Sequence, residues 1–232
     1  MIGVIGSPIL FWFFIGSGLG SSFRMNSPKG DTSYLEYFFP GTILLIMLFT
    51  AIFSTISIIE DRKEGFLQSV LVAPISSAGI ALGKLFGGTT LAVLQAIIFL
   101  AFAPFIGFQF SILGFFSLIV LLSVIAFGLT GLGFLIAWRM ESTQGFHAIM
   151  NLFLIPLWLL SGSLFPMQGA PGWLRGLMVI NPLTYSVSAI RLLLYHQVHV
   201  EHSGFVDSII VIFLFCTVVF IGSMFSVRKK QS

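Results

Sequence analysis

Long apolar runs alternate with short polar segments along this chain. A helix needs ~20 mostly apolar residues to cross the hydrocarbon core of a membrane. Strands of a membrane barrel would instead alternate over segments of ~10 residues. Six continuous runs meet or approach the helical length, at residues 2–20, 38–59, 81–105, 112–138, 148–165 and 206–227. The pattern predicts an all-α integral membrane protein with six transmembrane helices, forming one domain over residues 1–232.

A charged segment, "EDRKEGFLQSVLVAPIS", lies between the second and third runs at residues 60–76. After five charged residues and Gly65, the apolar residues Phe66, Leu67, Val70 and Leu71 recur at the spacing of one helix face. A proline at position 74 ends the pattern. We predict a short helix over 62–71 that lies across the ends of two spans. From this pattern alone, an anchoring helix and a docking element for a partner are equally good interpretations.

The segment between the fifth and sixth runs has a different pattern of apolar and polar residues. It predicts two short amphipathic helices within residues 171–195, opened by Pro171 and Pro182, because proline is favoured in the first helical turn. Neither helix is long enough to be an independent span. Trp173, Tyr185 and Tyr195 suit the membrane–water interface. We therefore expect two re-entrant helices that dip into one face of the membrane.

Glycines in the spans mark candidate close contacts between helices. Gly83 and Gly87 have the G-x-x-x-G spacing, and Gly128, Gly131 and Gly133 cluster in the fourth run. Small residues let membrane helices approach closely. Glycine is also generally enriched in membrane helices, so this second interpretation stays open for each pair.

Composition agrees with the apolar pattern and excludes several classes of protein. The chain is 57% hydrophobic and 8% charged, whereas soluble domains carry about 25% charged residues. The net charge is only +3, and the basic residues form no stripe along the chain, which argues against a nucleic-acid partner. Cys216 is the only cysteine, so a disulfide within one chain is excluded.

The distribution of lysine and arginine predicts the orientation. Cytoplasmic loops of membrane proteins carry an excess of these residues. With six spans, the side that holds both termini has the larger set, Arg62, Lys63, Lys84, Arg139, Arg228, Lys229 and Lys230. The other side has Arg24, Lys29, Arg175 and Arg191. We therefore expect both termini to be cytoplasmic.

Catalytic motifs are missing from the sequence. No H-E-x-x-H, no G-x-S-x-G and no clustered carboxylates occur in the apolar runs. The segment "AGIALGKL" at 78–85 resembles a phosphate-binding loop, but Leu85 stands where serine or threonine must hold magnesium. We predict no enzyme activity and no cofactor or metal bound by this chain. A zinc site is disfavoured because its candidate ligands lie in a segment that continues into a predicted loop. These candidates are His196, His199, Glu201 and His202.

Two stretches together resemble a known family, the type 2 permeases of ABC exporters, which are the membrane subunits of ATP-binding-cassette exporters. The first is "YFFPGTILLIMLFTAIFSTISIIEDRKEGFLQSVLVAPISSAGIALGKL" at residues 37–85. It has the family's aromatic-Pro-Gly start, its acidic-Arg-x-x-Gly turn, its P-I-S and its Gly-Lys, at Asp61, Arg62, Gly65, Pro74, Ile75, Ser76, Gly83 and Lys84. Asp61 stands where many members carry Glu, and Phe66 stands where many carry Thr.

The second stretch is "NLFLIPLWLLSGSLFPMQGAPGWLRGLMVINPLTYSVSAIR" at residues 151–191. It is similar to the late signature of the same family, with matches at Pro156, Ser161, Gly162, Phe165, Pro166, Pro171, Trp173, Asn181, Pro182, Tyr185 and Arg191. Both signatures occur in the family's order, and the resemblance covers nearly the whole chain.

The resemblance implies an assembly with a division of labour. Two copies of the chain, or the chain and a close relative, would pair in a bacterial inner membrane above two separate ATPase subunits, which bind ATP and Mg²⁺. The helix at 62–71 would be the coupling helix that seats in the ATPase. The implied coupling residues are Glu60, Asp61, Arg62, Lys63, Glu64, Gly65, Phe66, Leu67, Val70 and Leu71. Glu60 and Asp61 would face basic residues of that partner.

The same resemblance implies that the two re-entrant helices close the extracellular mouth of the transport path. The implied gate residues are Pro166, Pro171, Trp173, Asn181, Pro182, Tyr185 and Arg191. Arg191 would bind a lipid phosphate or an acidic substrate group, or would pair with a helix C-terminus; the two interpretations are equally good. The 27 phenylalanines favour an apolar or amphipathic cargo, namely a drug, a lipid or a lipid-linked glycan.

Two further expectations concern alternatives. Members of the family usually begin with a cytoplasmic amphipathic helix, whereas this sequence starts at the first span, so either that helix is missing or Met1 is an internal start. The competing function is a stand-alone channel or secondary transporter. That function needs paired ionisable residues inside the spans, and apart from Lys84 and residues at segment ends the runs carry none.

Overall fold

The computed structural model describes residues 2–19, 33–108, 111–195 and 203–231. Every regular element within these residues is a helix. The elements in chain order are α1 (Ile2–Leu19), α2 (Tyr34–Ser54), α3 (Ile56–Lys63), α4 (Phe66–Val72), α5 (Ser77–Leu100), η1 (Ala103–Ile106), α6 (Ile112–Ala137), α7 (Thr143–Leu159), η2 (Met167–Gly169), α8 (Gly172–Ile180), α9 (Pro182–Tyr195) and α10 (Phe205–Gln231). The all-α prediction is confirmed.

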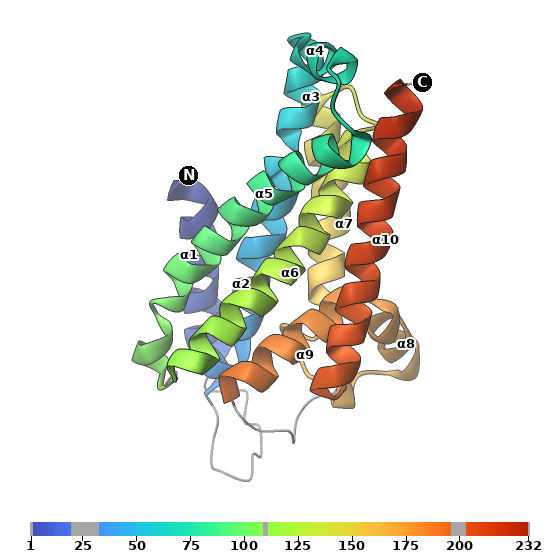
Figure 1. Cartoon of the computed structure of the whole chain (residues 1–232). Coiled ribbons are helices and arrows are strands. Elements are labelled where there is room, and N and C mark those ends of the chain that lie inside the picture. Colours follow the sequence, from blue (N-terminus) through green and yellow to red (C-terminus); the bar gives the residue numbers. More distant parts are fainter. Residues whose placement is uncertain (1, 20–32, 109–110, 196–202, 232) are drawn as a thin grey trace.

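The long helices form a bundle with a different cap at each end. The short helix α4 lies at one end, beside the last turns of α10, and the α8–α9 pair lies at the opposite end (Figure 1). Within the described residues, four helices are long and apolar enough to cross a membrane, namely Tyr34–Lys63, Ser77–Leu100, Ile112–Ala137 and Phe205–Lys229. The α8–α9 pair, bent by 81°, has the character of a broken span or a re-entrant loop.

The six-span count is therefore supported in part. The first predicted span corresponds to α1, in which the apolar helix Pro8–Gly18 is shorter than a full span. The fifth corresponds to α7, which has 17 residues. Both elements exist as helices where the apolar runs predicted them, and their crossing of the membrane stays a prediction.

Several predicted span bounds shift by a few residues because polar caps fix the helix ends. The third span was expected at 81–105, but α5 begins at Ser77, where the Ser76 side chain accepts a hydrogen bond from the Gly79 amide. The fifth was expected at 148–165, but α7 begins at Thr143, after the N-cap Ser142. The second span extends past the predicted 38–59 to cover Tyr34–Lys63. Apolarity alone does not report these ends.

The helix α2 lies at the centre of the bundle and contacts α1, α5, α6, α7 and α9. Its aromatic side chains pack against those of its neighbours: the ring of Phe39 stacks on Phe99 with centroids 4.8 Å apart, and Trp12 meets Phe39 edge-on at 5.8 Å. Membrane helices associate through such close packing rather than through exclusion of water. Of the most apolar stretch of Tyr34–Lys63, 72% is buried inside the protein, against 28% for Phe205–Lys229.

The glycine cluster of α6 allows close helix packing, as one interpretation of the sequence predicted. A side chain at Gly133 would meet the backbone of Ile52 in α2 at 2.9 Å. One at Gly131 would meet Val219 of α10 at 2.8 Å. By contrast, Gly83 and Gly87 have nothing within 4 Å of such a side chain, so this G-x-x-x-G pair makes no close contact with another helix among the residues that the structure describes.

Candidate functional site

The first candidate site is the α4 end of the bundle. The chain leaves α3 at Lys63, turns through Glu64 and Gly65, and enters α4 at Phe66. Gly65 has φ of +79°, a left-handed conformation that glycine adopts without strain. This turn corrects the prediction of one helix over 62–71: Arg62 and Lys63 belong to the end of α3, and α4 runs from Phe66 to Val72.

The apolar residues of α4 point in two directions. Leu67 is 3% exposed and belongs to the buried core, with Val70 and Leu71 half-buried beside it. Phe66 and Val72 are 58% and 86% exposed, and Ile75 just beyond the helix is also exposed. The sequence placed Phe66 on one face with Leu67, and this was wrong. The buried residues hold α4 against the bundle, and we call the exposed apolar residues of this segment the α4 patch (Phe66, Val72 and Ile75).

Arg62 ties the end of α3 to the connection between α6 and α7. Its guanidinium donates to the carbonyl oxygens of Trp138 at 2.6 Å and Met140 at 2.8 Å, and lies 5.9 Å from the centre of the Trp138 ring. Charge-assisted bonds of this kind are stronger than neutral ones. Arg62 therefore stabilises the base on which α4 rests and does not point outward with the α4 patch.

An ion pair joins α3 to the start of α5. Lys84 pairs with Asp61, and its ammonium also donates to the Ser57 hydroxyl at 3.3 Å. This corrects the expectation that Asp61 would pair with a partner protein, because its charge is already balanced within the chain. The neighbouring Glu60, Lys63 and Glu64 are exposed.

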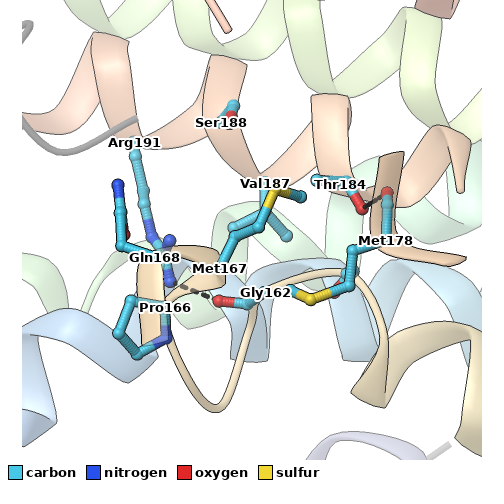
Figure 2. Close-up of a pocket in the computed structure, with 10 residues that line it drawn as sticks. Gly162, Pro166, Met167, Gln168, Met178, Thr184, Val187, Ser188 and Arg191 are labelled. Atoms are coloured by element: carbon cyan, nitrogen blue, oxygen red, sulfur yellow. Dashed lines mark hydrogen bonds between the residues drawn. The ribbon is translucent and has the colours of Figure 1, made fainter. Parts of the chain in front are cut away.

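The second candidate site is the α8–α9 end, where Arg191 is the central residue. Only 7% exposed, it projects from α9 toward the loop after α7 (Figure 2). Its Nη2 donates to the carbonyl oxygens of Gly162 at 2.9 Å and Tyr37 at 3.4 Å, and the guanidinium lies 4.1 Å from the centre of the Tyr37 ring. The guanidinium is thus directed into the protein, at a loop carbonyl, at α2 and at an aromatic face, which are partners that neither interpretation of Arg191 included.

Gly162 is the shared acceptor at this end. It has φ of +79°, and its carbonyl oxygen accepts from the Tyr37 hydroxyl at 2.9 Å as well as from Arg191. Tyr34 donates to the carbonyl of Leu164 at 3.0 Å. Two tyrosines of α2 and one arginine of α9 thus hold the loop after α7. Our sequence interpretation missed the tyrosines, although Tyr37 begins the aromatic-Pro-Gly stretch quoted above.

The bend between α8 and α9 has its own hydrogen bonds. The Asn181 side chain donates to the Leu157 carbonyl at 2.6 Å and accepts from the Leu183 amide at 3.0 Å, which caps α9. The Thr184 hydroxyl donates to the Met178 carbonyl at 2.6 Å, as drawn in Figure 2. Asn181 therefore fixes the bend and joins it to α7.

A small cavity lies beneath this bend. It has a volume of about 20 Å³ and is lined by Pro166, Gly162, Thr184 and Arg191, among others. A polar cavity of this size has room for about one water molecule. It is far too small for a drug or a lipid.

The remaining residues predicted for the gate, and the interfacial Tyr195, divide into exposed and hydrogen-bonded groups. Pro171 and Trp173 are exposed at the start of α8, as expected of interfacial residues, and Pro182 opens α9. Tyr185 donates to the Val179 carbonyl at 3.0 Å. Tyr195 donates to the carbonyl of Glu36, which the ring of Pro40 deprives of its usual helical donor. The two tyrosines tie α9 to α8 and to α2.

No group of three or more His, Cys, Asp or Glu side chains able to hold a metal occurs in the described part of the chain. The residues weighed as zinc ligands in the sequence, from His196 to His202, lie outside the described residues.

Comparison with known proteins agrees with the two signatures. The family model described as ABC-2 type transporter matches residues 2–195. The chain belongs to the ABC-2 type transporter family. With its apolar helices, this membership makes it a multi-pass membrane protein.

The chain is similar to several known proteins, three of which show the range of similarity. A putative transport permease ycf38 from Cyanophora paradoxa is 28% identical over 194 residues, covering 81% of this chain and 66% of the relative. The probable multidrug ABC transporter permease YbhR of Escherichia coli K12 is 30% identical over 157 residues, covering 67% and 42%. Nodulation protein J of Rhizobium meliloti is 27% identical over 198 residues, covering 82% and 72%. The chain thus spans less than two thirds of the length of the first two relatives.

Proposed function

We propose that this chain is the membrane-spanning permease subunit of an ABC exporter, and that a separate ATPase subunit docks on the α4 patch. The observation that carries the proposal is the division within α4: Leu67 is buried in the bundle while Phe66 and Val72 are exposed. Exposed apolar side chains next to a charged segment are typical of a surface that a partner covers. Membership of the ABC-2 family supplies the nature of that partner.

The contacts around α4 suit it to transmit a displacement. Two residues connect it to the span Tyr34–Lys63, and a short link that ends at Ser76 connects it to α5. It also contacts α10. Arg62 joins the same base to the α6–α7 connection. Movement of α4 by the ATPase would therefore reach several spans as rigid bodies, because packed elements shift as units rather than deform.

The proposed assembly has two permease copies, or this chain and a close relative, above two ATPase subunits that bind ATP and Mg²⁺. The α4 end faces the cytoplasm, with both termini, in a bacterial inner membrane. The exposed Glu60, Lys63 and Glu64 are available to basic and acidic groups of the ATPase. This chain contributes no catalytic residue to ATP hydrolysis.

At the other end, the α8–α9 pair would act as the gate. The bonds that Arg191, Tyr37 and Asn181 make to the loop after α7 would hold the path closed between transport events. Opening would require these hydrogen bonds to break and other hydrogen bonds to replace them. The proposed cargo is apolar or amphipathic, that is, a drug, a lipid or a lipid-linked glycan. The name of one bacterial relative, a probable multidrug permease, agrees with this class.

The test is co-purification of the chain with the ATPase encoded by a neighbouring gene. We expect wild type to retain the ATPase and Phe66→Asp to lose it, because the substitution places a carboxylate in the apolar contact. Phe105→Asp is the matched control, since Phe105 is 86% exposed in η1 at the far end of α5. The buried Leu67 is avoided because its substitution would disturb the fold of α4.

Insertion and solubility of each variant are checked by gel filtration in detergent. Retention of the ATPase by Phe66→Asp would reduce α4 to an anchoring helix. A wild-type chain that retains no ATPase would refute the exporter proposal. The favoured function would then be a stand-alone channel or secondary transporter.

A further inference from the structure

A second cavity lies on the side of the bundle, away from both candidate sites. It is a groove of about 660 Å³ formed by α5, α6 and α10. In Figure 1, α5 and α10 lie close together near α4, and α6 lies between them farther along. The groove residues Thr89, Val124 and Cys216 fall near the middles of these three helices. Because each helix is long and apolar enough to cross a membrane, this places the groove at the depth of the lipid chains.

The groove has an apolar surface even where its residues are polar. The hydroxyls of Thr89, Thr90, Ser123 and Thr217 each donate to the carbonyl four residues earlier in their own helix, at 2.7–2.8 Å. The thiol of Cys216 donates to the Val124 carbonyl at 3.2 Å. Their hydrogen-bonding capacity is used locally, and no charged residue lines the groove. A polar ligand would find few partners there.

Aromatic rings form much of the wall. Phe86 of α5 packs on Phe127 of α6 with centroids 5.8 Å apart, and Phe127 packs on Phe220 of α10 at 6.1 Å. Thr89 and Cys216 are buried, whereas Phe86 and Phe213 are exposed. The buried residues mark the floor and the exposed ones the rim. A flexible apolar chain that enters between the rims contacts protein on several sides.

The size of the groove suits a slender apolar occupant. Pockets of ~300–1,000 Å³ suit small ligands of drug-like size, and the groove volume of about 660 Å³ lies in this range. A single hydrocarbon chain fits within it.

We propose that the groove between α5, α6 and α10 binds a hydrocarbon chain of a membrane phospholipid. Lipid chains are the medium at this depth. The groove offers a chain more dispersion contacts than a convex helix face does, and such contacts add up although each is small. Phospholipid in the groove would thus stay bound longer than lipid elsewhere around the protein. The proposal does not depend on the ATPase, because one chain forms the whole groove.

The experiment uses the full chain in lipid nanodiscs that contain a phospholipid with a diazirine halfway along one acyl chain. After photolysis, cross-linked peptides are mapped by mass spectrometry. We expect labels to concentrate on the groove-lining stretches of α5, α6 and α10. Thr217→Trp, which fills the groove, should lower this labelling severalfold. Val218→Trp is the matched control, because Val218 is exposed on the same helix and does not line the groove, and it should leave the labelling unchanged.

If Thr217→Trp does not yield a monodisperse protein, Thr90→Trp on α5 replaces it, with Leu91→Trp as its control. Even labelling around all lipid-facing helices would overturn the proposal. So would groove labelling that both filling variants leave intact, or peptides of a second copy cross-linked across the groove. Displacement of the label by an amphipathic drug but not by excess unlabelled phospholipid would assign the groove to cargo instead.

Discussion

The two ends of the bundle are built in opposite ways. At the α4 end, apolar side chains point outward: Phe66 and Val72 are exposed while Arg62 and Asp61 make their bonds inside the chain. At the α8–α9 end, the polar Arg191 is turned inward, toward carbonyls of the loop after α7 and of α2. An outward apolar patch suits a contact with another protein. A set of hydrogen bonds directed into the protein suits a closure that opens only when those hydrogen bonds break and others replace them.

The comparison also shows where each end is rigid. The α4 end rests on ion-pair and arginine contacts among α3, α5 and the α6–α7 connection, so its outer surface is presented on a fixed base. At the α8–α9 end, Tyr37 and Arg191 share one acceptor, the carbonyl of Gly162, on the loop after α7. Removing one donor should therefore affect the α8–α9 end more than removing one charge affects the α4 end.

The largest effect is expected from Arg191→Ala. The change removes the donor to Gly162 and leaves a gap against the Tyr37 ring, which should lower the free energy of unfolding by about 3 kcal/mol. Thermal unfolding of the purified protein in detergent measures this, with Arg175→Ala as control because Arg175 is exposed on α8. Equal unfolding temperatures for the two variants would contradict the central position given to Arg191.

A smaller effect is expected from Leu67→Ala. Loss of this buried side chain should cost about 2 kcal/mol, at the lower end for such substitutions because α4 is short and peripheral. Phe66→Ala, one residue earlier and exposed, should change stability by no more than ~0.5 kcal/mol. The same unfolding measurement compares them. A reversed order would mean that Phe66, and not Leu67, holds α4 on the bundle.

The smallest effect concerns the ion pair at the α4 end. Asp61 and Lys84 are 20% and 30% exposed, so Asp61→Asn should cost only about 1 kcal/mol. Glu60→Gln is the neighbouring control on an exposed carboxylate and should cost nothing measurable. A double-mutant cycle with Lys84→Met isolates the coupling of the pair. A coupling near zero would show that Asp61 acts by some other contact.

The sequence predicted the elements well and their contacts poorly. Residues 112–138 were expected as a span, and α6 covers Ile112–Ala137. The two short helices before the last span were expected as well, and the proline-opened α9 begins at Pro182. The short helix expected at 62–71 is shifted to Phe66–Val72, because the left-handed turn at Gly65 separates Arg62 from α4. The chain position of Arg62 gave no sign that Trp138 and Met140 would receive its hydrogen bonds.

The sequence by itself determined that this is a helical membrane protein of the ABC-2 family, because uninterrupted apolar length and ordered local signatures are properties of consecutive residues. Only the tertiary structure decided which of these helices is central. The spans Tyr34–Lys63 and Phe205–Lys229 are similarly apolar, yet 72% of one apolar stretch and 28% of the other are buried in the protein. The physical reason is that lipid chains are as apolar as the protein core, so hydropathy does not distinguish a side chain that faces lipid from one that faces another helix. Packing makes that choice, through shape, at contacts such as Gly133 on Ile52.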